Sequence, residues 1–288
     1  MVLPNFIICG TQKGGTTSLY NYLKEHPQIY LPPKKEIHFF DLYFKRSIEW
    51  YRKHFIGAES QRFKAIGEAT PSYMYLEEVA ERIHNTLPEV KLIFILRNPV
   101  DRAYSHYWHE VRLGYEWLSF EEAIKAEPER LARGDIISRL HYSYLDRGKY
   151  IIQIDRFRKY FSKDQMLIII AEELWSNPEQ VMRKVFEFLG VDPTFKSKTW
   201  YKKFNVGNKK PRIKALQLIK GKLHRFVYSL PELELLIKPT SFIIDKINLT
   251  EGVPKMNPYT RKFLIKYFEP YNMGLEVYLG RKLDLLYQ

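Results

Sequence analysis

A glycine-rich segment between Gly10 and Ser18 carries the residue types that bind phosphate. It reads Gly-Thr-Gln-Lys-Gly-Gly-Thr-Thr-Ser and lies between an apolar run and a helical pattern. A strand-to-helix turn of this kind presents backbone N–H groups at a helix N-terminus, where anions bind. Lys13 adds a positive charge, and Thr16 and Thr17 add hydroxyl donors, as does the final serine. The segment predicts a phosphate site, with a plain glycine turn as the alternative.

The spacing of this segment differs from that of the usual nucleotide-triphosphatase loop. In that loop the lysine stands directly before the Ser or Thr, whereas here Gly14 and Gly15 separate Lys13 from Thr16. The pattern therefore favours a phosphate other than that of ATP. A P-loop kinase or triphosphatase stays open as an alternative, although it needs an aspartate at a strand end to hold Mg²⁺ and no predicted strand ends that way.

Further titratable and polar residues follow other predicted strands and the first predicted helix. Glu36 and His38 lie in a charged cluster set among aromatic residues. In open α/β sheets, ligand groups gather at the carboxyl ends of the strands, so one site can collect these residues. The segments concerned are Lys34–Asp41, Gly67–Tyr73 and Leu96–Pro99, with Asp101, Arg102 and Ser105 close behind.

Strand-like and helix-like patterns alternate over the first two-thirds of the chain, which predicts an α/β fold. We expect a P-loop-type parallel β-sheet flanked by helices, in a single domain. The expected strands are Asn5–Cys9, Lys64–Gly67, Lys91–Leu96 and Met166–Ile170. The expected helices are Gly15–Glu25, Glu77–Thr86, Pro99–Leu113, Ser119–Lys125, Tyr150–Tyr160 and Pro178–Leu189, then two closing helices, Pro258–Phe268 and Asn272–Leu279, separated by Pro270.

Charge is unevenly distributed along these 288 residues, whose formal net charge is +13. The stretch from Pro193 to Pro231 holds nine Lys and two Arg with no Asp or Glu. Such a run predicts an anionic partner or a solvated basic surface. The single cysteine, Cys9, excludes a disulfide framework and a cysteine-based metal site. With no signal peptide or membrane-spanning run in the pattern, we expect a soluble, cytoplasmic protein.

Five motifs occur together in a characteristic order. They are Gln-Lys-Gly-Gly-Thr-Thr-Ser at 12–18, His-Pro at 26–27, Lys-Glu-Ile-His-Phe-Phe-Asp at 35–41, Thr-Pro-Ser-Tyr at 70–73 and Ile-Leu-Arg-Asn-Pro at 95–99. In this order the chain resembles the sulfotransferases that use 3′-phosphoadenosine 5′-phosphosulfate (PAPS). It looks most like the branch that contains heparan sulfate N- and 3-O-sulfotransferases and their bacterial relatives. The resemblance spans most of residues 4–190 and 254–285.

The resemblance implies a role for each matching residue. Glu36 matches the catalytic base of the family, and His38 and Asp41 match residues that flank or support it. Arg97 and Ser105 match the residues that bind the 3′-phosphate of the donor. The 5′-phosphosulfate end would contact Lys13, Gly14, Gly15, Thr16, Thr17 and Ser18, with Lys13 at the oxygen that bridges phosphate and sulfate. From the chemistry alone, Glu36 or His38 can supply the base.

The chain also departs from the animal heparan-modifying members. Ala69 stands where they carry a lysine, and Glu251–Lys255 replaces a basic glycine loop. Their disulfide-bearing hairpin has no counterpart in a chain whose one cysteine is Cys9. Heparan specificity therefore does not transfer, although we expect the donor chemistry to survive. Lys209, Lys210 and Arg212 are candidates for a lid over the 3′-phosphate.

The sequence thus predicts a sulfotransferase domain over 1–288, with a donor-binding core (4–190), a basic lid or acceptor region (191–256) and closing helices (257–288). It would transfer a sulfuryl group from PAPS to a hydroxyl or amine of a carbohydrate, lipid or secondary metabolite, releasing adenosine 3′,5′-bisphosphate (PAP). We expect no metal and no nucleic-acid partner. A peripheral membrane contact through 213–247 stays open, as does a non-enzymatic binder of polyanions.

Overall fold

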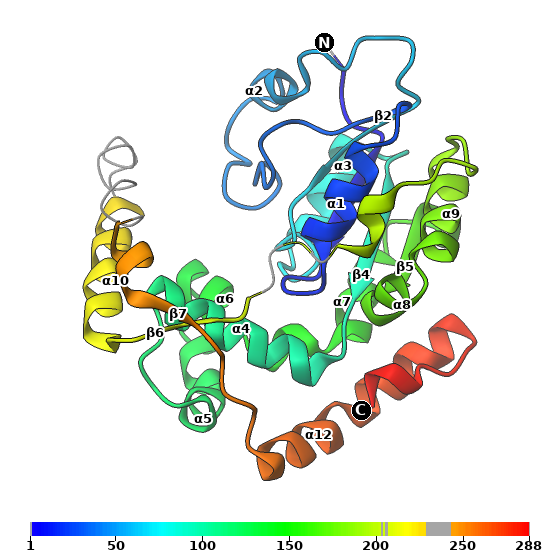
Figure 1. Ribbon diagram of the computed structural model, residues 1–288. Coiled ribbons are helices and arrows are strands. Elements are labelled where there is room, and N and C mark those ends of the chain that lie inside the picture. The colour runs from blue at the N-terminus through cyan, green and yellow to red at the C-terminus, as the bar shows by residue number, and fades with distance from the viewer. Residues whose placement is uncertain (1, 203, 205–206, 229–242, 288) are drawn as a thin grey trace. The chain divides into compact units, whose positions relative to one another are not determined.

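The computed structural model describes residues 2–202, 204, 207–228 and 243–287 (Figure 1). They form two compact units, each assembled from segments that are distant in the sequence. Unit 1 comprises Met1–Pro99, Lys149–Asn205 and Glu269–Gln288, and unit 2 comprises Val100–Gly148 and Val206–Phe268. We describe each unit by itself.

Unit 1 is built on a five-stranded parallel sheet with the strand order β2-β3-β1-β4-β5. The strands are β1 (Phe6–Gly10), β2 (Ile29–Tyr30), β3 (Ala65–Ala69), β4 (Lys91–Leu96) and β5 (Met166–Ile170). The central strands β1 and β3 are buried along their whole length. This explains the short apolar sequence of β1, because parallel strands are covered on both faces; β3 is apolar except for Glu68.

Helices connect these strands and cover the sheet of unit 1. They are α1 (Thr16–Lys24), α2 (Ile48–Arg52), α3 (Val79–Thr86), α7 (Tyr150–Phe157), α8 (Ala171–Ser176) and α9 (Pro178–Leu189). Short 3-10 turns follow at Lys53–Phe55, Lys163–Gln165, Lys198–Tyr201 and Asp284–Leu286. Pro178 begins α9, where its missing N–H costs no hydrogen bond, and Gly190 ends the helix in the left-handed conformation.

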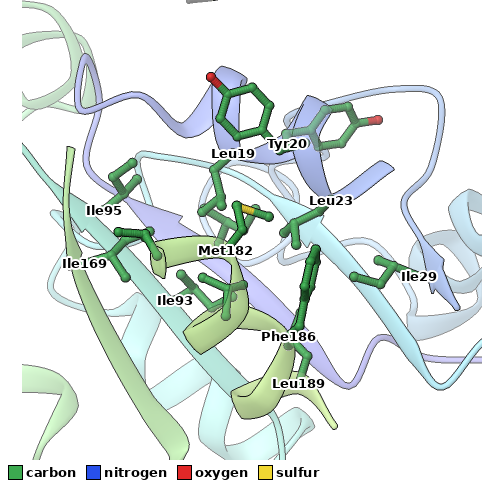
Figure 2. Packing of buried hydrophobic residues seen from close by; sticks show 14 of the residues in the cluster. Leu19, Tyr20, Leu23, Ile29, Ile93, Ile95, Ile169, Met182, Phe186 and Leu189 are labelled. Carbon is green, nitrogen blue, oxygen red and sulfur yellow. The ribbon is translucent and has the colours of Figure 1, made fainter. Parts of the chain in front are cut away.

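One apolar cluster joins the sheet of unit 1 to helices α1 and α9 (Figure 2). Ile93 and Ile95 point from β4 toward this cluster, as Ile169 does from β5. Helix α9 contributes Phe186, whose side chain is fully buried. Phe94, which alternates with the two isoleucines, instead contacts Phe157 of α7 at a ring distance of 5.0 Å. The period of two along β4 therefore places helices on both faces of the sheet.

Unit 2 is mainly helical. It holds α4 (Pro99–Leu113), α5 (Phe120–Leu131), α6 (Ile136–His141) and α10 (Lys214–Tyr228), with a 3-10 turn at Asp146–Gly148. Strands β6 (Lys209–Pro211) and β7 (Leu249–Glu251) pair antiparallel. Ser119 and Glu122 form the capping box at the start of α5 that their spacing predicts. Helix α12 (Pro258–Leu279) contributes its first half to this unit and its second half to unit 1.

The α/β class and the parallel sheet flanked by helices are confirmed. Each of the four predicted strands is present within about two residues of its expected bounds, and the pattern missed β2 of this sheet as well as β6 and β7 of unit 2. The prediction of two closing helices is wrong, because α12 runs unbroken through Pro270. A proline inside a helix removes one hydrogen bond, but buried Leu264, Phe268 and Leu275 hold both halves of α12 in place.

Two further expectations concern the basic region. The stretch 196–212, expected as a loop, contains a 3-10 turn and strand β6. Apolar residues recur at helical spacing from Ile213 to Phe226, and this part of the chain forms α10. Residues 229–242, which belong to the stretch 213–247 considered for membrane contact, lie outside the described residues. Within the described part of the chain, none of the helices combines the length and apolar character that crossing a membrane requires.

Candidate active site

The segment between β1 and α1 forms a tight turn that leads directly into a helix. Lys13 and Gly15 take positive φ angles of 66° and 105°, and Gly15 is the N-cap of α1. A Cβ on Gly14 would lie 2.6 Å from the Ile95 carbonyl oxygen, so glycine is needed where the turn meets β4. Within the described residues no side chain caps α1, and its first turn is free of acidic residues. The N–H groups at this end therefore suit an anion.

The three hydroxyl residues of this turn differ in their surroundings. Thr16 is buried and Thr17 is half-buried. Ser18 is also buried, and its Oγ accepts a hydrogen bond from the Phe204 backbone N–H at 3.1 Å. Ser18 therefore connects α1 to a segment far along the chain. Its contact with a phosphate stays a prediction, as do those of the two threonines.

Arg97 follows β4 directly and lies beside the phosphate turn. Its guanidinium lies 5.5 Å from the Trp175 ring, and Nη1 is 3.4 Å from the Lys13 carbonyl oxygen. Its Nε is buried and has no hydrogen-bond partner among the described residues. An unsatisfied buried donor costs about 1–3 kcal/mol, a cost that a phosphate oxygen would offset. The residues at this edge therefore suit an anion, and the contact of Arg97 with the 3′-phosphate stays a prediction.

Hydrogen bonds across the sheet gather the phosphate turn, Glu36 and Arg97 at one edge. Strand β1 pairs in parallel with β3 on one side and with β4 on the other. The Thr11 N–H donates to the Ile95 carbonyl of β4 at 2.8 Å, and the Glu36 N–H donates to the Ala69 carbonyl of β3 at 3.1 Å. These contacts all lie at the carboxyl ends of adjacent strands, where ligands of open α/β sheets bind.

Glu36 and His38 form a charged cluster at this edge. Both take the left-handed backbone conformation, with φ angles of 64° and 58°. Lys35 Nζ donates to Glu36 Oε1 at 2.8 Å, and His38 Nε2 lies 3.7 Å from Glu36 Oε2. His38 Nδ1 lies 2.9 Å from Asp41 Oδ2. The Glu36 carboxylate is thus flanked by a lysine and by a histidine that another carboxylate holds.

These contacts set the charges of the cluster. Burial alone would raise the pKa of Glu36, but His38 and Lys35 outweigh it and lower this pKa to about 2. Burial alone would lower the pKa of His38, but Asp41 and Glu36 outweigh it and raise this pKa to about 9. At neutral pH, Glu36 is therefore an anion and His38 is a cation. Whether Glu36 or His38 acts as the base stays a prediction.

A buried polar network lies behind this cluster. Most of its residues belong to the segments Lys34–Asp41 and Gly67–Tyr73 that the sequence analysis names, but their contacts were not predicted. Ser72 Oγ donates to Asp41 Oδ2 at 2.5 Å. Glu68 is buried and accepts hydrogen bonds from Tyr51 and Thr70, each at 2.7 Å, and from Tyr73 at 3.2 Å. Burial raises the pKa of Glu68 to about 7, although these hydroxyl groups oppose the rise. A lone glutamate on a strand gives little signal of such a network.

The remaining predicted site residues belong to unit 2. Ser105 lies in α4 and is half-buried, and its contact with the 3′-phosphate stays a prediction. Lys209 and Lys210 lie on β6, followed by exposed Arg212, and their lid role also stays a prediction. The described part of the chain shows no group of three or more His, Cys, Asp or Glu side chains placed to hold a metal ion.

Comparison with known proteins identifies the type of domain. The family model described as "Sulfotransferase domain" matches residues 3–227. Membrane-associated sulfotransferase kil1 of Dictyostelium discoideum is 44% identical over 140 residues, which cover 45% of this chain and 29% of that protein. The mouse bifunctional heparan sulfate N-deacetylase/N-sulfotransferase 4 is 35% identical over 208 residues (67% and 23%). The mouse heparan sulfate glucosamine 3-O-sulfotransferase 6 is 32% identical over 214 residues (74% and 59%).

The chain therefore spans about a quarter of the length of the first two relatives. Among solved structures, a sulfotransferase from Alicyclobacillus acidocaldarius has a TM-score of 0.74 and 28% sequence identity, and the match covers 100% of both chains. This similarity extends over the whole chain, including the basic stretch and α12.

Proposed function

The chain belongs to the sulfotransferase domain family, whose members use PAPS, and on that premise we propose that it sulfates a hydroxyl or amine of a carbohydrate, lipid or secondary metabolite. The observation that carries the proposal is the meeting of the glycine turn, Glu36 and Arg97 at adjacent strand ends. Together these residues offer an anion cradle and an ionised base at one edge of the sheet.

The donor side of this site is supported by its charge and backbone. When the sulfuryl group leaves, negative charge develops on the phosphate of PAPS. Fixed N–H groups and cations stabilise such charge without having to reorganise, as they do in phosphoryl transfer. We assign this role to Lys13 and the N-terminus of α1, with Gly14, Gly15, Thr16, Thr17 and Ser18 lining the turn. Arg97 and Ser105 would hold the 3′-phosphate, where a planar guanidinium suits paired oxygens.

The acceptor side depends on Glu36. The bond between the sulfur and the bridging oxygen of PAPS breaks, and a new bond forms between the sulfur and the acceptor oxygen or nitrogen. The acceptor proton passes to the Glu36 carboxylate, and PAP leaves. His38 is already protonated at neutral pH, so in this proposal it orients Glu36 and adds positive charge instead of accepting the proton.

Replacing Glu36 with glutamine tests the assignment. The Glu36→Gln variant should lose about 100- to 10,000-fold in turnover, because the amide cannot accept the proton. Its affinity for PAP should stay within about two-fold of the parent, because Glu36 does not belong to the phosphate turn. Calorimetric titration with PAP measures binding, and release of PAP from PAPS, with water or a screened acceptor, measures turnover. Full activity of the variant would refute the assignment of Glu36 as the base. Absence of PAP binding by the parent would refute the assignment of PAPS as the donor.

A further inference from the structure

The Glu36 carboxylate receives its closest contact from its immediate neighbour, Lys35. Lys35 Nζ lies 2.8 Å from Glu36 Oε1, whereas His38 Nε2 lies 3.7 Å from Glu36 Oε2. The Lys35 side chain is only 17% exposed, compared with 44% for Glu36. The lysine is therefore more sheltered than the acid that it contacts. This distinguishes the pair from an ordinary surface ion pair, in which both groups are solvated.

The backbone explains how adjacent residues form this contact. In an extended strand, successive side chains point to opposite faces, so neighbours do not meet. Glu36 instead takes a left-handed conformation with a φ of 64°, which is unfavourable for a residue with a Cβ. The hydrogen bond from its N–H to the Ala69 carbonyl ties this conformation to the end of β3. An unfavourable conformation persists only where its surroundings enforce it, and such positions cluster at functional sites.

The second cation of the cluster has another partner. His38 Nδ1 faces Asp41 at 2.9 Å, and the Asp41 side chain is fully buried. Asp41 is held in turn by the Ser72 hydroxyl and by the Leu42 backbone N–H. His38 is therefore fixed mainly from the Asp41 side, and it reaches Glu36 only at a longer distance. Lys35 is therefore the cation of this cluster that lies closest to the Glu36 carboxylate.

We propose that Lys35 is a positioning residue for the general base, which fixes the Glu36 carboxylate through Oε1 while His38 faces Oε2. This inference rests on the proposed function, since it assumes that Glu36 accepts the proton. Lys35 would restrict rotation of the carboxylate and keep it ionised before the acceptor binds. A base that is held in one orientation loses less freedom when the reaction begins.

The charged groups around Glu36 determine how its pKa should change when Lys35 is replaced. The groups that face the carboxylate are Lys35 and His38, with Asp41 behind His38 and buried Glu68 further behind. An opposite charge within hydrogen-bond distance lowers the pKa of a carboxylic acid by about one to three units. Because Glu36 is partly exposed, we expect an effect at the lower end of this range when Lys35 is replaced.

The test compares the variants Lys35→Met, Lys35→Arg and Lys34→Met in full-length protein. Lys34 is the matched control, since it is exposed, adjacent and of the same charge. Turnover is measured as PAP release from PAPS with water as the acceptor, across pH 2 to 9, so that the range includes the protonation of Glu36, whose pKa is about 2. For Lys35→Met we expect about ten-fold lower turnover at pH 7. We also expect the acid limb of the pH profile, where protonation of Glu36 stops turnover, to shift upward by about one pH unit. Lys35→Arg should restore most of the activity, and Lys34→Met should match the parent.

Several outcomes would overturn the inference. An unchanged acid limb in Lys35→Met would do so, and so would an equal displacement in Lys34→Met, which would indicate a general charge effect. Loss of PAP affinity without a change in the acid limb would assign Lys35 to the donor instead. Adding Lys35→Met to Glu36→Gln separates the two proposals. If Glu36 is the base, the second substitution should lower the residual activity no further; a full additional loss means that Lys35 acts independently of Glu36.

Discussion

His38 is charged because Asp41 holds it, and this dependence can be measured. Burial lowers the pKa of His38, whereas Asp41 and Glu36 raise it to about 9 from an ordinary value of 6.5. Replacement of Asp41 with asparagine removes the first of the two charges that oppose burial. In Asp41→Asn we therefore expect the pKa of His38 to fall by at least one unit from about 9, toward or below its ordinary value of 6.5. Nuclear magnetic resonance of the imidazole ring measures this directly, and an unchanged midpoint would contradict the assigned contact.

The same shift predicts how stability depends on pH. A histidine whose pKa is raised on folding contributes stability that is fully present below 6.5 and is lost as the pH rises through 9. The parent should therefore be more stable than Asp41→Asn by roughly 2 kcal/mol at pH 6, and this pH-dependent part should vanish near pH 10. Urea unfolding at the two pH values provides the comparison. A difference that is independent of pH would mean that only the neutral hydrogen bonds of Asp41 matter.

At the level of residues, the sequence identifies the residue types of the candidate site better than it identifies the contacts between them. The motif around Glu36 and His38 could be identified because chemistry-bearing residues occur there at a recognisable spacing. The bond between Ser72 and Asp41 joins positions 31 apart, so no local pattern reports it. The pair Lys35 and Glu36 is adjacent in sequence, yet its contact depends on a left-handed backbone that propensities disfavour.

At the level of elements, the glycine turn between β1 and α1 leads to a further prediction. A Cβ on Gly14 would approach the Ile95 carbonyl to 2.6 Å and the Thr11 side chain to 2.7 Å. Gly14→Ala should therefore displace the turn and weaken PAP binding about ten-fold or more, because the N–H groups lose their common direction. Calorimetric titration with PAP measures this loss.

The matched control for this substitution is Gly274→Ala in α12. The nearest heavy atoms to a Cβ at this position lie 3.4 Å away on Ile151, an ordinary contact. Alanine also favours a helix interior by about 1 kcal/mol relative to glycine. The control should bind PAP as the parent does and unfold at the same or a slightly higher temperature. Equal PAP affinity in both variants would show that the turn tolerates a side chain and that its glycine is not required.

Helices and strands were predictable wherever a strong local sequence pattern agrees with the burial of those residues in the folded chain. Strand β4 is such a case, because Leu92–Leu96 is a continuous apolar run that is buried on both faces. Helix α12 is the opposite case. Pro270 is a strong local stop signal, but burial on both sides of it sustains the helix. Strand β2 has only two residues, too few to show any period.

At the level of the whole molecule, basic charge and exposed apolar residues occur together on one described segment of unit 2. Ile213 and Ile219 are 59% and 60% exposed, and Lys214 and Lys222 are exposed near them. The same helix buries Lys220, whose Nζ contacts Asp245 at 2.6 Å. In the described part of α10, Ile219 is exposed and Lys220 is buried, and Ile213 is exposed just before the helix begins. Exposed apolar and basic groups on one segment suit an anionic membrane surface, which is the contact through 213–247 that the sequence leaves open.

The membrane prediction is tested by co-sedimentation with vesicles that contain phosphatidylserine. Each basic residue near an anionic surface contributes about 1 kcal/mol, so we expect binding at low salt that weakens as the ionic strength rises. The variant with Ile213→Ser and Ile219→Ser should bind about ten-fold more weakly, because it has less apolar surface to insert. Ile152→Ser on α7, where the isoleucine is 42% exposed, is the matched control and should bind like the parent. If the parent stays in the supernatant at low salt, or the control loses as much binding as the double variant, α10 is not a membrane-binding surface.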